Sequence, residues 1–161
     1  MSRDRVELLK DEFEMANSRE GWYAPLAALL EGIGPVEAAW QPPGGGNTIW
    51  QTVNHLNYYN ERILLRVRGA EVAPGLGTNE ATFGPGNPED AAAWAATVQK
   101  AHEIAEGYAR VLPELTDADL QQEVFGGPLL STLSALVLHL AYHTGQVALI
   151  RKMQHSWPAT R

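Results

Sequence analysis

Clusters of glycine and proline divide this chain into long segments, and they constrain its fold more than any other feature. The longest cluster is QPPGGG at residues 41–46. A helix cannot continue through it, because proline lacks the amide hydrogen and glycine loses the most backbone entropy on folding. Further breaks fall at residues 32–35, 69–87 and 126–128. Between the breaks apolar residues recur every three or four positions, which predicts four helices with one buried face each.

The first two helices have recognisable ends. The first is expected over residues 4–31, with Gly21 and Pro25 inside it as points where it could kink or divide. The second follows a Thr48–Gln51 capping box, in which a threonine precedes the helix and a glutamine lies three residues later. We expect this helix to end near residue 68.

The other two helices are also bounded by local signals. Asn87 and Pro88 predict the start of the third helix, which should reach residue 112. Residues 116–120 are expected to form a short helical turn. Ser131 is a candidate cap for the fourth helix, which should reach residue 154. No convincing pair of strands is present.

Four helices with long connections predict an all-α four-helix bundle, with residues 1–161 forming a single helical domain. The connection at residues 70–87 is rich in glycine, proline and asparagine. Such a loop cannot satisfy its backbone groups internally. We therefore expect it to flank the mouth of a functional site or a subunit contact rather than to be buried.

The composition excludes several kinds of chemistry. The chain has no cysteine, so disulfides, thiolate metal sites, iron–sulfur clusters and a cysteine nucleophile are ruled out. A metal site would have to use nitrogen and oxygen ligands. The net charge of -7 disfavours nucleic acid as a partner. Arg62, Arg66 and Arg68 are interpreted as a solvated helix face.

Neither a signal peptide nor a membrane span is expected. Residues 1–10 are charged and lack an apolar stretch. The longest apolar stretch, residues 129–150, is interrupted by two histidines, Gly145 and Gln146. We therefore expect no membrane partner and a cytoplasmic location.

The most informative motif is the pair His139 and His143. A spacing of four places two side chains on one helix face, about 6 Å apart along the axis, so both imidazoles can reach one metal ion. The surrounding helix is the most apolar in the chain, so at least one of the two faces the core. Surface helices also carry such pairs without metal, so the motif alone leaves both interpretations open.

Three further histidines remain. His55 lies near the start of the second helix, and spacing cannot place it beside the pair. A lone histidine there is more often a hydrogen-bonded core or surface residue. His102 is best interpreted as part of an exposed helix face, and His155 as part of a polar tail.

Two stretches resemble the DinB/YfiT-like superfamily of metal-binding four-helix bundles: residues 48–56 (TIWQTVNHL) and residues 138–146 (LHLAYHTGQ). That family shows a histidine early in the second long helix and His-x3-His followed by Gly-Gln in the last helix. Residues 115–120 (LTDADL) match a further short element of the family. The resemblance covers nearly the whole chain.

The resemblance implies that His55, His139 and His143 are three ligands of one divalent ion, with zinc or nickel expected. It also implies a homodimer and, from characterised members, transfer of a low-molecular-weight thiol. Three neutral ligands leave a coordination position open, as in catalytic sites, and metal affinity should fall below about pH 6.5 as imidazoles take up protons. Alternatives are a metal-dependent hydrolase, a metal or small-molecule binding protein without turnover, and a bundle whose histidines bind no metal.

Overall fold

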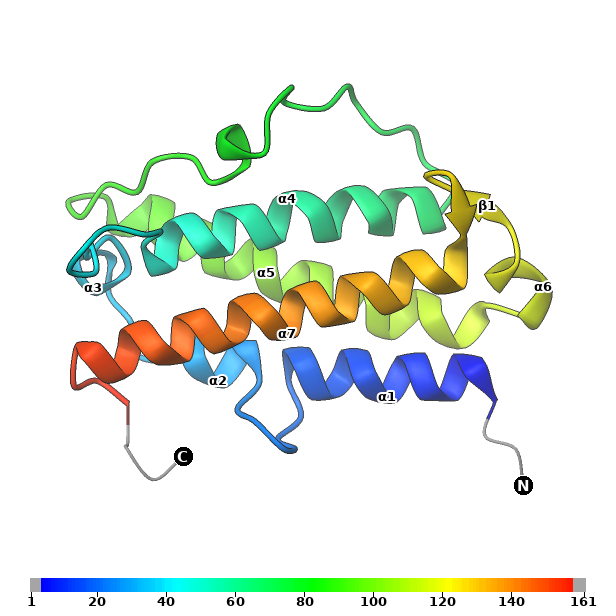
Figure 1. Ribbon diagram of the computed structural model, residues 1–161, viewed down its shortest axis with the longest axis horizontal. Helices are drawn as coiled ribbons and strands as arrows, with labels where there is room; N and C mark the ends of the chain where they lie inside the picture. Colours follow the sequence, from blue (N-terminus) through cyan, green and yellow to red (C-terminus); the bar gives the residue numbers. More distant parts are fainter. Residues whose placement is uncertain (1–3, 158–161) are drawn as a thin grey trace.

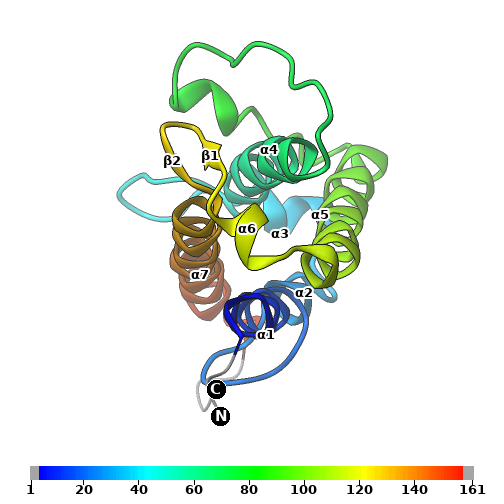
Figure 2. The ribbon, with the colours of Figure 1, turned by 90° about the vertical axis from the view of Figure 1, so that its right-hand side faces the viewer.

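The computed structural model describes residues 4–157, and its long helices lie side by side (Figure 1). The four long helices are α1 (Arg5–Asn17), α4 (Ile49–Val67), α5 (Ala91–Val111) and α7 (Leu129–Met153). Viewed along their axes in Figure 2, they surround a common core, with α4 packed against α5 and α7 packed against both α1 and α4. The all-α four-helix bundle is confirmed.

The first predicted segment, residues 4–31, is divided into two helices in the part that holds Gly21 and Pro25, the residues at which a division was expected to be possible. Helix α1 ends at Asn17, whose side chain donates to the carbonyl oxygen of Phe13 at 2.9 Å. A new helix, α2 (Leu26–Leu30), begins after Pro25. Proline lacks an amide hydrogen and disfavours helical backbone in the residue before it, so the helix restarts there rather than continuing.

A further short helix, α3 (Pro35–Ala38), was not anticipated. Proline occupies its first position, where the missing amide hydrogen has no helical partner. The Gly34 amide donates to the Glu37 carboxylate at 3.0 Å and so closes the helix start. Sequence reasoning took Pro35 as a stop signal, although the same residue can begin a helix.

The starts of α4 and α5 show how capping works here. The capping box of α4 is confirmed, since the Gln51 amide donates to Thr48 Oγ1 at 3.1 Å and the Thr48 amide donates to Gln51 Oε1 at 2.9 Å. Helix α5 begins three residues later than expected, because the Asp90 carboxylate accepts from the Ala93 amide at 2.9 Å. Asn87 instead accepts from the Glu89 amide, in a turn before the helix.

A small hairpin precedes α7 and corrects the expectation of no paired strands. Strands β1 (Glu123–Val124) and β2 (Gly127–Pro128) pair antiparallel, and β2 leads directly into the helix. Pro128 therefore occupies the cap position, and Ser131 lies inside the helix rather than capping it. The remaining elements are short: η1 (Glu80–Thr82), η2 (Leu112–Glu114) and the expected turn α6 (Asp117–Leu120).

Helix α7 is the most apolar of the four long helices. Among the described residues it is the one helix long and apolar enough to cross a membrane by length and composition, with mean hydropathy 1.3 in its most apolar window. Of that window, 44% is buried inside the structure, where α7 packs against α1, α2 and α4. Packing in the bundle core accounts for the apolar residues of this buried part of the helix.

A close approach of α4 to α5 depends on Gly107. A Cβ atom on this residue would clash with Leu64 Cδ2, and Leu64 is itself buried in the core. The two helices can therefore pack this closely only because Gly107 has no side chain.

We predict that Gly107→Ala lowers the free energy of unfolding by about 1–3 kcal/mol, because the added methyl group overpacks the α4–α5 contact. The matched control is Gly145→Ala on α7, where a Cβ would meet nothing within 4 Å. There the gain in helix propensity should raise stability by about 0.5–1 kcal/mol. Urea unfolding measures both, and a stabilised Gly107→Ala variant would contradict the packing argument.

Candidate metal centre

Three histidines meet between two helices of the bundle. His55 lies on α4, and His139 and His143 lie one turn apart on α7. One ring nitrogen from each falls within 4.8 Å of the others, and the Nε2 atoms of His55 and His139 are 2.9 Å apart. Nitrogens bound to one ion at 2.0–2.1 Å are about 2.9–3.4 Å apart, so the spacing of His55 and His139 fits a zinc-sized ion, and the His143 nitrogen lies near enough to join them. The spacing of residues in the sequence could not predict that His55 lies beside the His139–His143 pair.

His55 is held in one orientation by Thr82 of η1. Its Nδ1 atom lies 2.6 Å from Thr82 Oγ1, and that hydroxyl donates to the carbonyl oxygen of Asn79 at 2.6 Å. Because the hydroxyl hydrogen is used there, the imidazole must donate from Nδ1. Its Nε2 lone pair then points toward the other two histidines, which is the tautomer that a metal requires.

Phe83 covers the outer face of the His55 ring. The two rings stack at a centroid distance of 4.1 Å, and the Asn54 side chain donates to the Phe83 carbonyl oxygen at 2.9 Å. His55 is accordingly 3% exposed. The expectation that residues 70–87 flank the site is confirmed, and Figure 1 shows this loop passing over α4.

His143 is oriented by a neighbour on its own helix. Its Nδ1 atom lies 2.7 Å from Gln146 Oε1, so Nδ1 donates and Nε2 is free to bind an ion. In the Gly-Gln pair that follows His-x3-His, the glutamine thus orients the ring of His143. Thr82 and Phe83 were missed from the sequence; one signal was that Phe83 is the single aromatic residue of the 70–87 loop.

The site is open on the side of His139. This histidine lines a cavity of about 490 Å³ between α4 and α7, together with Tyr59, Leu136 and other residues. Among the described residues, the three histidines form the one group of His, Cys, Asp or Glu side chains spaced to hold an ion. The arrangement therefore offers three neutral nitrogen ligands, with room for a small molecule beside them.

The comparison with known families agrees with this geometry. A model of the DinB superfamily matches residues 20–147, which include α4 and all three histidines. The chain belongs to the DinB superfamily. Neither the curated proteins nor the solved structures gave a match. Proteins of this superfamily bind metals, and the three-histidine cluster can hold an ion.

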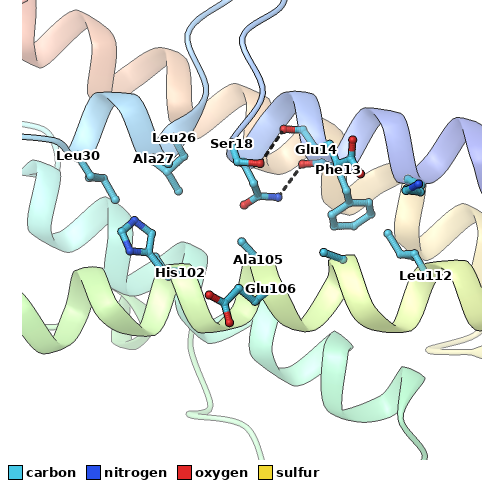
Figure 3. A pocket seen from close by; sticks show the side chains of 14 residues that line it. Phe13, Glu14, Ser18, Leu26, Ala27, Leu30, His102, Ala105, Glu106 and Leu112 are labelled. Atoms are coloured by element: carbon cyan, nitrogen blue, oxygen red, sulfur yellow. Dashed lines mark hydrogen bonds between the residues drawn. The ribbon is translucent and has the colours of Figure 1, made fainter.

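The remaining histidines of this DinB protein lie elsewhere. His102 is exposed on α5 and lines a separate cavity of about 260 Å³, where side chains of α1 and α2 face those of α5 (Figure 3). His155 is exposed after the end of α7. Neither belongs to the three-histidine cluster, in agreement with the interpretation of both as residues outside the site.

The three histidines of the cluster all have lowered pKa values. Burial, and then the neighbouring His143 and His139, lower the pKa of His55 to about 4. Burial and His143 also lower the pKa of His139 to about 4. Burial lowers the pKa of His143, although its hydrogen bond to Gln146 opposes the shift. His55 and His139 should thus stay neutral, and able to bind an ion, well below the pH of about 6.5 expected from an unperturbed imidazole.

We predict that the metal-free protein loses stability as the pH falls from about 6.5 toward 4. In that window the unfolded chain takes up protons at His55 and His139 while the folded chain does not, so protonation favours unfolding. Between pH 7 and 5 we expect a loss of at least about 1 kcal/mol, after allowing for the solvent that reaches His139.

Urea unfolding of chelator-treated protein at several pH values measures this loss. His139→Asn should make the dependence on pH shallower, because one shifted imidazole is gone. The control His102→Asn, at an exposed position, should leave the slope as it is. An equal slope in the wild type and His139→Asn would show that the cluster is not its source.

Proposed function

We propose that this protein is a metal-dependent enzyme that transfers a low-molecular-weight thiol to an electrophile, with one divalent ion held by His55, His139 and His143. The observation that carries the proposal is the meeting of three neutral imidazoles beside a cavity. Bound there, zinc or nickel would lower the pKa of a thiol or a water molecule at its open position. Because the chain has no cysteine, a thiol cosubstrate would supply the sulfur nucleophile.

The lining of the cavity favours thiol transfer over hydrolysis. Hydrolytic sites built on helical histidine pairs use a carboxylate as the general base for water. The described residues that line the cavity beside His139 include no aspartate or glutamate. A thiol loses its proton far more readily than water does, so it depends less on such a base.

Elemental analysis together with thiol-transfer assays tests this proposal. We expect about one zinc or nickel per chain and consumption of glutathione or cysteine with an electrophile such as monochlorobimane. A chelator should abolish this activity, and the returned ion should restore it. His143→Ala should stay folded, because the packing of the other helices is untouched, and should lose most of its metal.

His102→Ala is the matched control, since it removes a histidine outside the cluster. Its metal content and activity should equal those of the wild type. Full metal occupancy in His143→Ala would refute the ligand set. A metal-loaded protein that turns over no thiol but retains small molecules would favour the binding protein without turnover.

We also propose that the protein forms a homodimer through the outer face of α7. Four large apolar side chains lie exposed on this helix at intervals of four and seven residues, so they share one stripe: Leu138, Tyr142, Leu149 and Met153. A contiguous apolar stripe on a helix surface is typical of a contact with another chain. A second copy suits it because a self-complementary stripe can pair with itself around a two-fold axis.

Sedimentation at micromolar concentration tests this assembly. Leu149→Glu should shift the protein toward monomer, because the contact would bury an unpaired charge. The control Val36→Glu places the same charge on an exposed apolar position of α3, outside the stripe, and should have no effect. A wild-type monomer at these concentrations, or a dimer indifferent to Leu149→Glu, would rule out this interface.

A further inference from the structure

The cavity beside His139 has an unusual electrostatic character for this protein. The chain as a whole carries a net charge of -7. The described residues that line the cavity nevertheless include one guanidinium, Arg62, and no carboxylate. Apolar side chains, among them Ile63 and Leu136, form much of the remaining wall. A small anion with an apolar body is therefore the kind of molecule that this lining suits.

The cavity extends along both helices from the histidine cluster. Arg62 follows His55 by seven residues on α4, and Thr132 precedes His139 by seven residues on α7. Seven residues make about two turns, so each pair shares a helix face and is separated by about 10 Å along the axis. A molecule in the cavity can thus reach the histidines with one end while its other end lies near Arg62.

The Arg62 side chain is already held in place. Its Nη1 atom donates to the carbonyl oxygen of Ala73 at 2.8 Å, and its guanidinium carbon lies 5.1 Å from the centre of the Tyr58 ring. The hydrogen bond uses one of five N–H groups, which leaves donors for a ligand. A guanidinium fixed in advance loses little side-chain entropy on binding, and its planar fork matches a carboxylate.

Phe125 supplies a second observation at the far wall. It forms the β1–β2 turn together with Gly126, and both residues have positive φ angles, 55° and 83°. Such a turn favours Asn-Gly or Gly-Gly, so a phenylalanine there is strained. Its ring is largely exposed to solvent and lines the cavity, so the strain places an apolar surface where a ligand would contact it.

We propose that the cavity binds a small molecule that carries a carboxylate on an apolar body, with the carboxylate held by Arg62 and the apolar body packed against Phe125 and Leu136. The end of this molecule that is remote from the carboxylate lies at His139. The placement of a reactive group at that end rests on the proposed function, whereas the binding of the carboxylate by Arg62 does not. A single guanidinium balances a single negative charge, which favours a carboxylate over a phosphate dianion.

Calorimetric titration of the zinc-loaded protein with mercaptohexanoate and with mercaptohexanol, its neutral analogue, tests the assignment. The acid should bind about ten- to a hundredfold more tightly, as expected of a hydrogen-bonded charge pair. Arg62→Gln should abolish this difference and leave the affinity for the alcohol unchanged. Phe125→Asn, which suits the turn better, should weaken the binding of both compounds alike.

Arg110→Gln is the matched control, since it removes an equal charge from an exposed position on α5. The preference for the acid should survive in this variant. A preference that also survives Arg62→Gln would overturn the proposal, because the carboxylate would then bind elsewhere, for example at the metal. Tighter Arg62-dependent binding of hexyl phosphate than of hexanoate would overturn the choice of a carboxylate.

Two further measurements separate this proposal from the proposed function. Hexanoate, which has no thiol, should bind the metal-free protein and lose about ten- to a hundredfold in affinity in Arg62→Gln. In cobalt-loaded protein, mercaptohexanoate should change the visible spectrum if its thiol reaches the ion. Arg62-dependent binding of hexanoate with an unchanged cobalt spectrum would support the carboxylate site and count against thiol transfer. A spectral change without Arg62-dependent binding would support a thiol at the ion and contradict the carboxylate site.

Discussion

The structure around the candidate metal centre depends on one constraint, which is that three imidazoles packed together in a core must all stay neutral. Charged rings at these distances would repel one another and lose their hydration. The hydrogen-bond partners that orient them are neutral as well: Thr82 for His55 and Gln146 for His143. A carboxylate in either place would favour the protonated ring. Neutral partners keep the ring nitrogens available to an ion. In the ion-free protein they leave the folded state less stable at acidic pH.

The site is closed on one side and open on the other. Phe83 and the 70–87 loop cover His55, whereas His139 faces the cavity between α4 and α7. Burial of His55 fixes its geometry, and exposure of His139 to the cavity gives a small molecule access. A purely structural site would be closed on all sides by protein ligands. The asymmetry is therefore the feature of the fold that best supports a role in chemistry.

Sequence reasoning succeeded where the information was local. The His139–His143 pair and the Thr48 capping box each depend on residues within one or two turns, and both are present as expected. The resemblance, rather than spacing, brought His55 to the pair, because no periodicity within one helix determines which other helix lies beside it. Thr82 was not predicted for the same reason: it contacts His55 across 27 residues of sequence, from a long loop whose one regular element is the short helix η1.

The basic residues of α4 show how a correct pattern can carry an incomplete interpretation. The spacing of Arg62, Arg66 and Arg68 predicts a solvated face, and Arg66 and Arg68 are exposed. Arg62 is half-buried, however, and Arg66 lies over the ring of Phe125, 5.4 Å from its centre. The helical period that aligns Arg62 with His55 was visible in the sequence. The groups that hold the two arginines are the Ala73 carbonyl oxygen of the 70–87 loop, the Phe125 ring of the β1–β2 turn and the Tyr58 ring one helical turn earlier on α4. Whether a helix face is solvated or takes part in a site therefore depends on which other segments pack against it. Here those segments include the 70–87 loop and the β1–β2 turn, whose positions cannot be predicted from the local sequence of α4.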